Sequence, residues 1–227
     1  MELRVMTYNI LHGMDYPLWR TEKRAVIDLS KTAEGIRGGG ADICGLNEVR
    51  GAGLTPEYTA QADTIGGLLG FHHVFGRSIY VGGTEPYGNG LVSRYPIAAS
   101  EVIPIPDPIV DGRVPDGVES RSVLRCTFDF AGDKHLTVLT THFGLSLPER
   151  ENAAALCRRL LESEKNPTIL LGDFNFLPAE IGQADVFHLV IHTLQFPSFI
   201  LRLISRQRSS GISEPTTLTT SELTSAP

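Results

Sequence analysis

Five polar residues stand where short apolar segments of the chain end, and together their side chains could do chemistry. They are Asn9, Glu48, His142, Asp173 and Asn175. An apolar segment is expected to be buried, and an ionisable group at its end needs a partner. Two carboxylates with two amide oxygens form an oxygen-rich set, which suits a hard divalent ion such as Mg²⁺ or Mn²⁺. These residue types therefore predict an oxygen-lined site for a divalent ion.

Taken alone, each of these residues has a simpler structural explanation. Asn9 belongs to a type that is common in turns, and His142 could be a core histidine whose hydrogen bonds are satisfied. Asp173 and Asn175 could form an Asx-type turn before Pro178. The functional interpretation rests on their joint occurrence.

Strand and helix patterns alternate around these positions. Apolar runs predict strands at residues 3–10, 41–49 and 168–171, and helical spacing predicts helices at 21–37, 58–69 and 148–164. Short β-rich runs separated by Gly, Pro and Asp fill residues 72–143, and Gly88-Asn89-Gly90 is interpreted as a hairpin or loop. We therefore expect an α/β layered fold with mixed sheets, in which strand ends converge on one ligand-binding edge.

The composition is that of a globular protein without a general affinity for polyanions. The chain has 227 residues, of which 41% are hydrophobic and 20% charged, with a formal net charge of −6. An acidic chain gains no general attraction to nucleic acid, which disfavours avid non-specific binding. Three scattered cysteines without a C-x-x-C pair indicate reduced thiols. With no signal peptide and no membrane span expected, the predicted location is the cytoplasm.

Five motifs in order make the chain resemble the endonuclease/exonuclease/phosphatase superfamily, the metal-dependent phosphodiesterase fold of pancreatic deoxyribonuclease and bacterial sphingomyelinases. The motifs are MTYNIL (6–11), ADICGLNEV (41–49), GNGLVSRYPI (88–97), TTHFGL (140–145) and LLGDFNFLP (170–178). The resemblance covers about residues 2 to 180. It implies a four-layer α/β sandwich, with two mixed β-sheets face to face and helices outside.

The resemblance also implies a role for each of the five polar residues. Asn9 and Glu48 match the positions that hold the divalent ion, with Glu48 as its direct ligand. His142 matches a histidine that contacts the scissile phosphate. Asp173 matches the carboxylate that orients or deprotonates the attacking water, and Asn175 matches an amide that steadies the phosphate.

Glu119 and Arg121 lie where many members of the superfamily carry a similar pair, so both are candidate substrate-binding residues. The implied activity is Mg²⁺- or Mn²⁺-dependent hydrolysis of a phosphoester, in which the ion offsets the negative charge that grows in the transition state. A protonated His142 would add to that effect. The expected partner is a small phosphoester, a lipid headgroup or a nucleic acid.

One part of the superfamily pattern is missing. Its members normally close with an Asp-His pair, whereas this sequence has no Asp-His and no Asp after Asp185. We therefore expect an incomplete domain over residues 1–199, whose terminal strands are missing or altered, and a disordered Ser/Thr-rich tail over 200–227. A frameshift or truncation would explain this, and so would a natural variant with replaced terminal strands. The alternative function is that of a catalytically impaired member that retains the fold or binds phosphorylated ligands.

Overall fold

The computed structural model describes residues 2–175, 200–207 and 216–219. The strands are β1 (Glu2–Asn9), β2 (Ile43–Arg50), β3 (His72–Val81), β4 (Glu85–Ser93), β5 (Ala99–Pro104), β6 (Ser122–Phe130), β7 (Lys134–His142), β8 (Thr168–Asp173), β9 (Ile200–Gln207) and β10 (Thr216–Thr219). The helices are α1 (Tyr16–Glu22), α2 (Leu29–Gly39), α3 (Gln61–Leu69) and α4 (Leu147–Ser163), with a short 3₁₀ turn at Leu11–Gly13.

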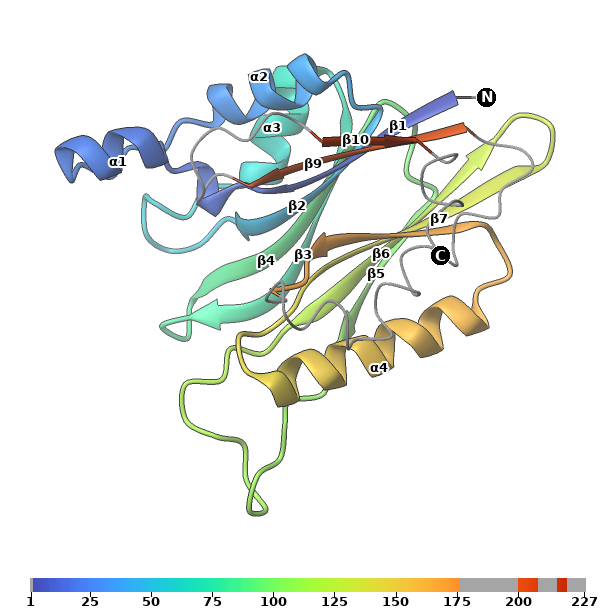
Figure 1. The fold of residues 1–227 in the computed structure, drawn as a ribbon. Helices are drawn as coiled ribbons and strands as arrows, with labels where there is room; N and C mark the ends of the chain where they lie inside the picture. The colour runs from blue at the N-terminus through green and yellow to red at the C-terminus, as the bar shows by residue number, and fades with distance from the viewer. Residues whose placement is uncertain (1, 176–199, 208–215, 220–227) are drawn as a thin grey trace.

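These elements form two mixed sheets packed face to face (Figure 1). The larger sheet has the order β10-β9-β1-β2-β4-β3, and the smaller has the order β5-β6-β7-β8. Strand β1 runs parallel to β2, and β7 runs parallel to β8. Strand β4 runs antiparallel to its neighbours β2 and β3, and β6 runs antiparallel to its neighbours β5 and β7. The predicted α/β fold with two mixed sheets is confirmed.

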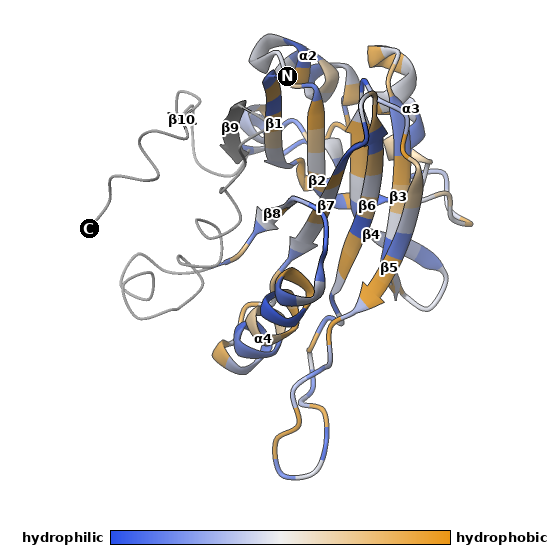
Figure 2. Ribbon diagram, turned by 90° about the vertical axis from the view of Figure 1, so that its right-hand side faces the viewer, coloured by the Kyte–Doolittle hydropathy of each residue, from blue (hydrophilic) through white to orange (hydrophobic). Residues whose placement is uncertain are grey.

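Three hydrophobic clusters hold four layers together. The cluster between the sheets includes Leu3, Ile43, Leu124 and Phe128, each with no exposed surface. A second cluster packs α2 and α3 against the outer face of the larger sheet, and a third packs α4 against the outer face of the smaller one. Figure 2 shows hydrophobic residues along the strands of both sheets, where the layers meet. Burial on both faces of each sheet explains why several strands read as near-continuous apolar runs.

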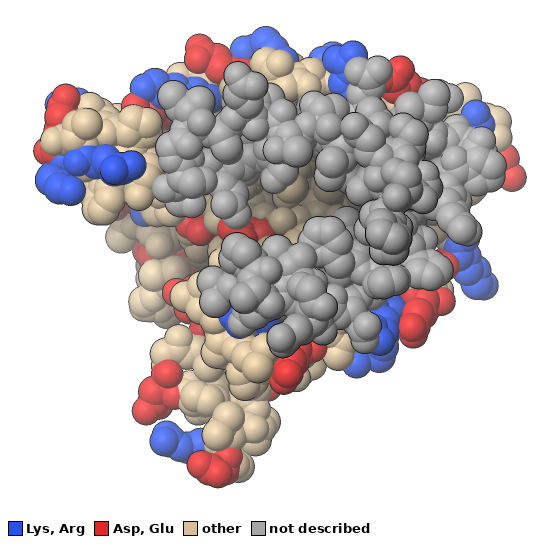
Figure 3. All heavy atoms as spheres, in the orientation of Figure 1, with Lys and Arg blue, Asp and Glu red and all other residues tan. Residues whose placement is uncertain are grey.

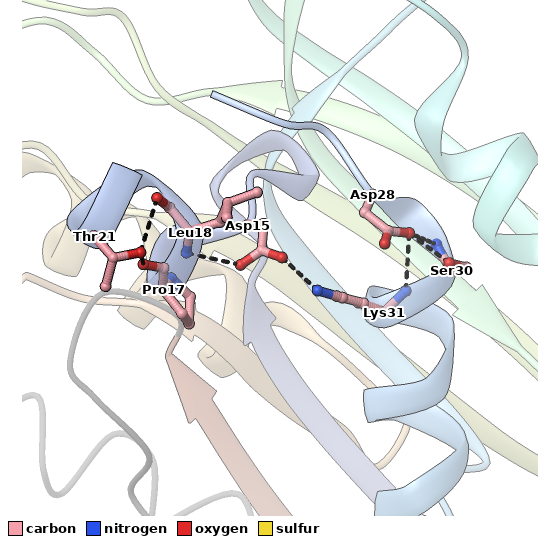
Figure 4. A network of polar contacts seen from close by, with 7 residues as sticks. All are labelled: Asp15, Pro17, Leu18, Thr21, Asp28, Ser30 and Lys31. Carbon is pink, nitrogen blue, oxygen red and sulfur yellow. Dashed lines mark hydrogen bonds and ion pairs between the residues drawn. The ribbon is translucent and has the colours of Figure 1, made fainter. Parts of the chain in front are cut away.

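The helix predicted over residues 21–37 is instead two helices. The chain leaves α1 at Lys23, which adopts a left-handed conformation, and enters α2 at Asp28, whose carboxylate accepts hydrogen bonds from the amides of Ser30 and Lys31. Asp15 caps α1 and also pairs with the ammonium group of Lys31 on α2 (Figure 4). Helical spacing alone could not reveal this break, because capping decides it.

The Gly88-Asn89-Gly90 segment lies inside strand β4, so its interpretation as a hairpin or loop is wrong. A Cβ atom on Gly88 would lie 2.1 Å from the carbonyl oxygen of Gly76 on β3. Glycine is required here because the two strands approach closely, a constraint that the local sequence does not encode.

Two strands occupy part of the region for which the sequence predicted no regular structure. Strand β9 pairs in parallel with β1, and β10 pairs antiparallel with β9. The division of the chain at residue 199 is not tested by these pairings and stays a prediction. No helix within the described ranges is long and apolar enough to cross a membrane.

A matched pair of glycine substitutions would test the strand packing at β4. Gly88→Ala should destabilise the protein by about 1–3 kcal/mol, because the new methyl group meets fixed backbone of β3. Gly38→Ala on the exposed face of α2, where a Cβ meets nothing within 4 Å, should raise stability by up to about 1 kcal/mol. Urea denaturation measures both, and equal effects of the two substitutions would contradict the assigned β3–β4 packing.

Candidate active site

The carboxyl ends of β1, β2, β7 and β8 surround a pocket of about 470 Å³. Every residue that the sequence singled out lines it, namely Asn9, Glu48, Glu119, Arg121, His142, Asp173 and Asn175. Four of them occupy the last residues of these strands or the turn that follows, as the strand-end argument predicts. The structure therefore brings all seven together, while their individual chemical roles stay predictions.

Asn9 joins two carboxylates that come from different sheets. Its Nδ2 atom donates to Glu48 Oε1 at 2.8 Å and to Asp173 Oδ2 at 3.0 Å. The backbone amide of Leu11 donates to Asn9 Oδ1 at 3.0 Å, which fixes the orientation of the Asn9 amide. The sequence predicts Asn9 as a metal-holding residue, and in this structure it positions the two carboxylates.

The donor atoms in the pocket fit a small divalent ion. Glu48 and Asp173 are like charges held around one amide nitrogen, and a cation beside them would offset their repulsion. Within the described part of the chain, no group of three His, Cys, Asp or Glu side chains is arranged to hold a metal ion. Mg²⁺ is often bound through one or two carboxylates and keeps several waters, so Glu48 with Asp173 nearby is a sufficient donor set.

His142 is nearly buried, with 7% of its surface exposed. Burial, together with the positive charge of Arg121, lowers the pKa of His142 to about 4. The imidazole is therefore neutral near pH 7, so the positive charge at this end of the pocket belongs to Arg121. The sequence analysis considered a protonated His142, which burial disfavours.

Two N–H donors face the His142 ring. Arg121 Nη1 lies 3.3 Å from Nδ1, and Asn175 Nδ2 lies 3.1 Å from Nε2. A neutral imidazole has only one acceptor nitrogen, so it can satisfy only one of these donors at a time. An anion in the pocket would accept the donor that is left over. Arg121 also donates from Nη2 to Glu119 Oε2 at 2.9 Å, which orients its guanidinium group.

Asp173 takes part in both arrangements that the sequence allowed. Its Oδ1 atom accepts a hydrogen bond from the Asn175 amide at 3.2 Å, which is an Asx-type turn. Its Oδ2 atom faces Asn9 in the pocket. The turn holds Asn175 so that its side chain reaches His142 and the carbonyl oxygen of Phe143. The structural and functional interpretations of Asp173 are therefore compatible.

Backbone strain is concentrated at this pocket. Among the described residues, seven that are not glycine have a left-handed φ. Four of these line the pocket: Leu11 (47°), His12 (42°), Glu48 (59°) and Asn175 (50°). At Glu48 the β2–β4 register also shifts between Leu46 and Val49, which marks a bulge. Such strain persists only where surrounding structure enforces it, and it clusters at functional sites.

A buried amide network lies under the pocket and connects the sheets. Asn47 Nδ2 donates to Asn89 Oδ1 and to the carbonyl oxygen of Thr141, both at 2.8 Å. Asn89 Nδ2 in turn donates to the carbonyl oxygen of Ser122 at 3.0 Å. Asn47 is fully buried and Asn89 is 1% exposed. The network ties β2 and β4 to β6 and β7, so it sets the distance between the parts of the site that each sheet carries.

Several pocket residues were missed by the sequence analysis. They are Leu11, His12, Arg50, Tyr58, Val81, Tyr87 and Leu145. Tyr87 donates to Glu48 Oε2 at 3.1 Å, so it shares with Asn9 the task of orienting that carboxylate. Their position in the sequence could have identified several of them, because these residues lie within or next to the recognised motifs.

After Asn175, the structure describes only residues 200–207 and 216–219. His188 and His192, which lack an adjoining Asp, lie outside the described residues. The incompleteness of the domain therefore stays a prediction.

Comparison with known families assigns the chain to one of them. A sequence model of the Endonuclease/Exonuclease/phosphatase family matches residues 6–188, so the chain belongs to this family. A search of curated proteins found no match.

Solved structures share the fold. An endonuclease/exonuclease/phosphatase from Beutenbergia cavernae is 27% identical with a TM-score of 0.63, and the match covers 78% of this chain and 49% of that one. A family protein from Leptotrichia buccalis is 16% identical (TM-score 0.58, covering 83% and 72%), and a mannosyl-6-phosphatase from Bacteroides thetaiotaomicron is 19% identical (0.53, covering 75% and 64%). The chain thus spans about half the length of the Beutenbergia protein.

The lowered pKa of His142 predicts a loss of stability in acid. The unfolded chain binds a proton at about pH 6.5, whereas folded His142 does so only at about pH 4. The contribution of neutral His142 to the free energy of unfolding is therefore fully present above pH 6.5 and is lost as the pH falls toward 4. At about 1.4 kcal/mol per pH unit, the loss should reach about 2 kcal/mol at pH 5.

Urea denaturation at pH 7.5 and pH 5 measures this loss. His142→Gln should lose less stability between the two pH values than the unsubstituted protein does. His135→Gln is the control, because nearby Asp129 raises the pKa of the exposed His135. An unchanged acid loss in His142→Gln would show that His142 is not the group responsible.

Proposed function

We propose that this protein hydrolyses a phosphoester with the help of a divalent ion, Mg²⁺ or Mn²⁺. The observation that carries the proposal is the single pocket in which a carboxylate pair, Glu48 and Asp173, faces a cluster of N–H donors around His142. Family membership supports phosphoester hydrolysis, and so does the likeness to a structure described as a mannosyl-6-phosphatase.

Each carboxylate of the site has a defined task in this proposal. Glu48, oriented by Asn9 and Tyr87, would hold the ion, which when bound withdraws charge from a phosphate oxygen. Asp173 is held by hydrogen bonds from Asn9 and from the Asn175 amide, and its carboxylate would orient water and accept its proton.

The phosphate itself would meet the opposite side of the pocket. Arg121 supplies a guanidinium, which suits phosphate oxygens because of its planar fork of donors. Asn175 supplies a further N–H donor, and the ring of neutral His142 lies between the Asn175 and Arg121 donors and accepts from one of them. These groups are already held by hydrogen bonds before a substrate arrives, so little reorganisation is needed when charge develops in the transition state.

The surface favours a small substrate over a long polyanion. The chain carries a formal net charge of −6, and in Figure 3 the Lys and Arg side chains of the described residues alternate with Asp and Glu side chains. Such a surface gives little of the counterion release that drives non-specific nucleic-acid binding. A small phosphoester is therefore the first substrate class to test.

The direct test is hydrolysis by metal-stripped protein of bis(p-nitrophenyl) phosphate and p-nitrophenyl phosphate. We expect release of p-nitrophenol with Mg²⁺ or Mn²⁺, its loss in excess chelator and its return when the ion is restored, because the ligands offered are oxygens. A rate that chelator leaves unchanged would contradict the role of the ion. If phosphate binds but no ion supports turnover, the impaired-member alternative holds instead.

Glu48→Gln should lower the rate at least about 100-fold while the fold persists, because the substitution keeps the shape and removes the charge that holds the ion. Steady-state kinetics measure the loss, and near-ultraviolet circular dichroism checks the fold. Glu151→Gln on the exposed surface of α4 is the matched control and should leave the rate unchanged. Equal rates for Glu48→Gln and the control would mean that Glu48 is structural.

A further inference from the structure

Arg50 is a cation in the pocket whose charge the proposed chemistry does not use. It is the last residue of β2, two positions after Glu48, and it lines the same pocket. Arg121 pairs with Glu119, whereas no carboxylate of a described residue lies within ion-pair distance of Arg50. An unpaired guanidinium that lines a largely preformed pocket calls for an anionic ligand.

The position of Arg50 is rigid. Its backbone amide donates to Gln61 Oε1 at 2.9 Å, and Gln61 is fully buried. Its Nη1 atom donates to the carbonyl oxygen of Glu57 at 3.1 Å, and its guanidinium carbon lies 4.7 Å from the centre of the Tyr58 ring. Arg50 Nη2 makes no hydrogen bond to any described residue, so this end of a fixed side chain is available to a ligand.

His12 lines the same pocket and is linked to Arg50 through Gln61. Gln61 Nε2 donates to the carbonyl oxygen of His12 at 2.8 Å, so one buried side chain ties the segments that carry His12 and Arg50 together. His12 and Arg50 both line the pocket, and burial, with a further contribution from the charge of Arg50, lowers the pKa of His12 to about 4. A neutral His12 can donate one N–H to a ligand.

Arg50 and Arg121 enter the pocket from different sheets and have different partners. Tyr87 donates to Glu48 Oε2 at 3.1 Å, and both side chains line the pocket that the two arginines also line. Arg50 ends β2 of the larger sheet and contacts Glu57 and Tyr58, whereas Arg121 directly precedes β6 of the smaller sheet and contacts His142 and Glu119. The pocket volume of about 470 Å³ falls within the range of about 300–1,000 Å³ that is typical of small-molecule sites, so it accommodates more than one phosphate group.

We propose that Arg50 and His12, held by Gln61, form a second anion-binding position that takes a phosphate group which is not hydrolysed. The substrate class is then a small molecule with two spaced phosphate groups, one at Arg121 and His142 and one at Arg50. This inference rests on the proposed function for the identity of the first position.

The test is equilibrium titration at fixed ionic strength, in excess chelator so that no turnover occurs. The probes are adenosine 3′,5′-bisphosphate and the two corresponding monophosphates. The bisphosphate should bind at least about tenfold more tightly than either monophosphate, because it engages both positions. Arg50→Met, which keeps the length of the stem, should reduce this advantage to about onefold, and Arg50→Lys should retain part of it.

Arg24→Met, which removes an exposed charge outside the pocket lining, is the matched control and should keep the full advantage. An unchanged advantage in Arg50→Met would overturn the proposal, and so would the absence of any preference for the bisphosphate in the unsubstituted protein. Because binding is measured without turnover, these outcomes are separate from a failure to hydrolyse p-nitrophenyl esters, which bears on the proposed function alone.

Discussion

The site depends on one amide group that holds two carboxylates from different sheets. Asn9 donates to Glu48 from the larger sheet and to Asp173 from the smaller one. Without such a donor, nothing would offset the repulsion between two like charges in a partly buried pocket. The position of the two sheets relative to each other therefore sets the geometry of the chemistry, and anything that shifts one sheet changes the distance between the carboxylates.

The buried amides below the pocket make this arrangement rigid. Asn47 and Asn89 are buried and connect β2 and β4 with the carbonyl groups of Ser122 and Thr141. Buried polar groups are tolerated when they are hydrogen-bonded, and such networks then specify one packing of the layers. Apolar contacts alone would hold the sheets together without selecting this register.

The pocket combines a strained backbone with a neutral histidine and charged arginines. Glu48 and Asn175 both adopt left-handed conformations, and each presents a side chain to the pocket. His142 stays neutral because burial and Arg121 disfavour its charge, so positive charge is carried by arginines, which do not lose their protons. The positive charge of the pocket therefore comes from Arg50 and Arg121, and not from its two histidine rings.

The sequence by itself determined the fold class and singled out seven of the residues that line the pocket. Apolar runs that end in Asn9, Glu48, His142 and Asp173 predicted strands whose carboxyl ends meet, because both the period of the pattern and the polar residue at its end are local properties. The structure confirms the mixed α/β sandwich, and all seven predicted residues line one pocket.

Tertiary structure alone decided how these residues act on one another. The donor role of Asn9, the neutral state of His142 and the presence of Arg50 in the pocket depend on neighbours that are distant in sequence, such as Asp173 at 164 positions from Asn9. Gly88 was misread for the same reason, since the need for glycine comes from the approach of β3. Hydrogen-bond direction, burial and charge at a site are properties of the packed layers, and no local pattern in the chain encodes them.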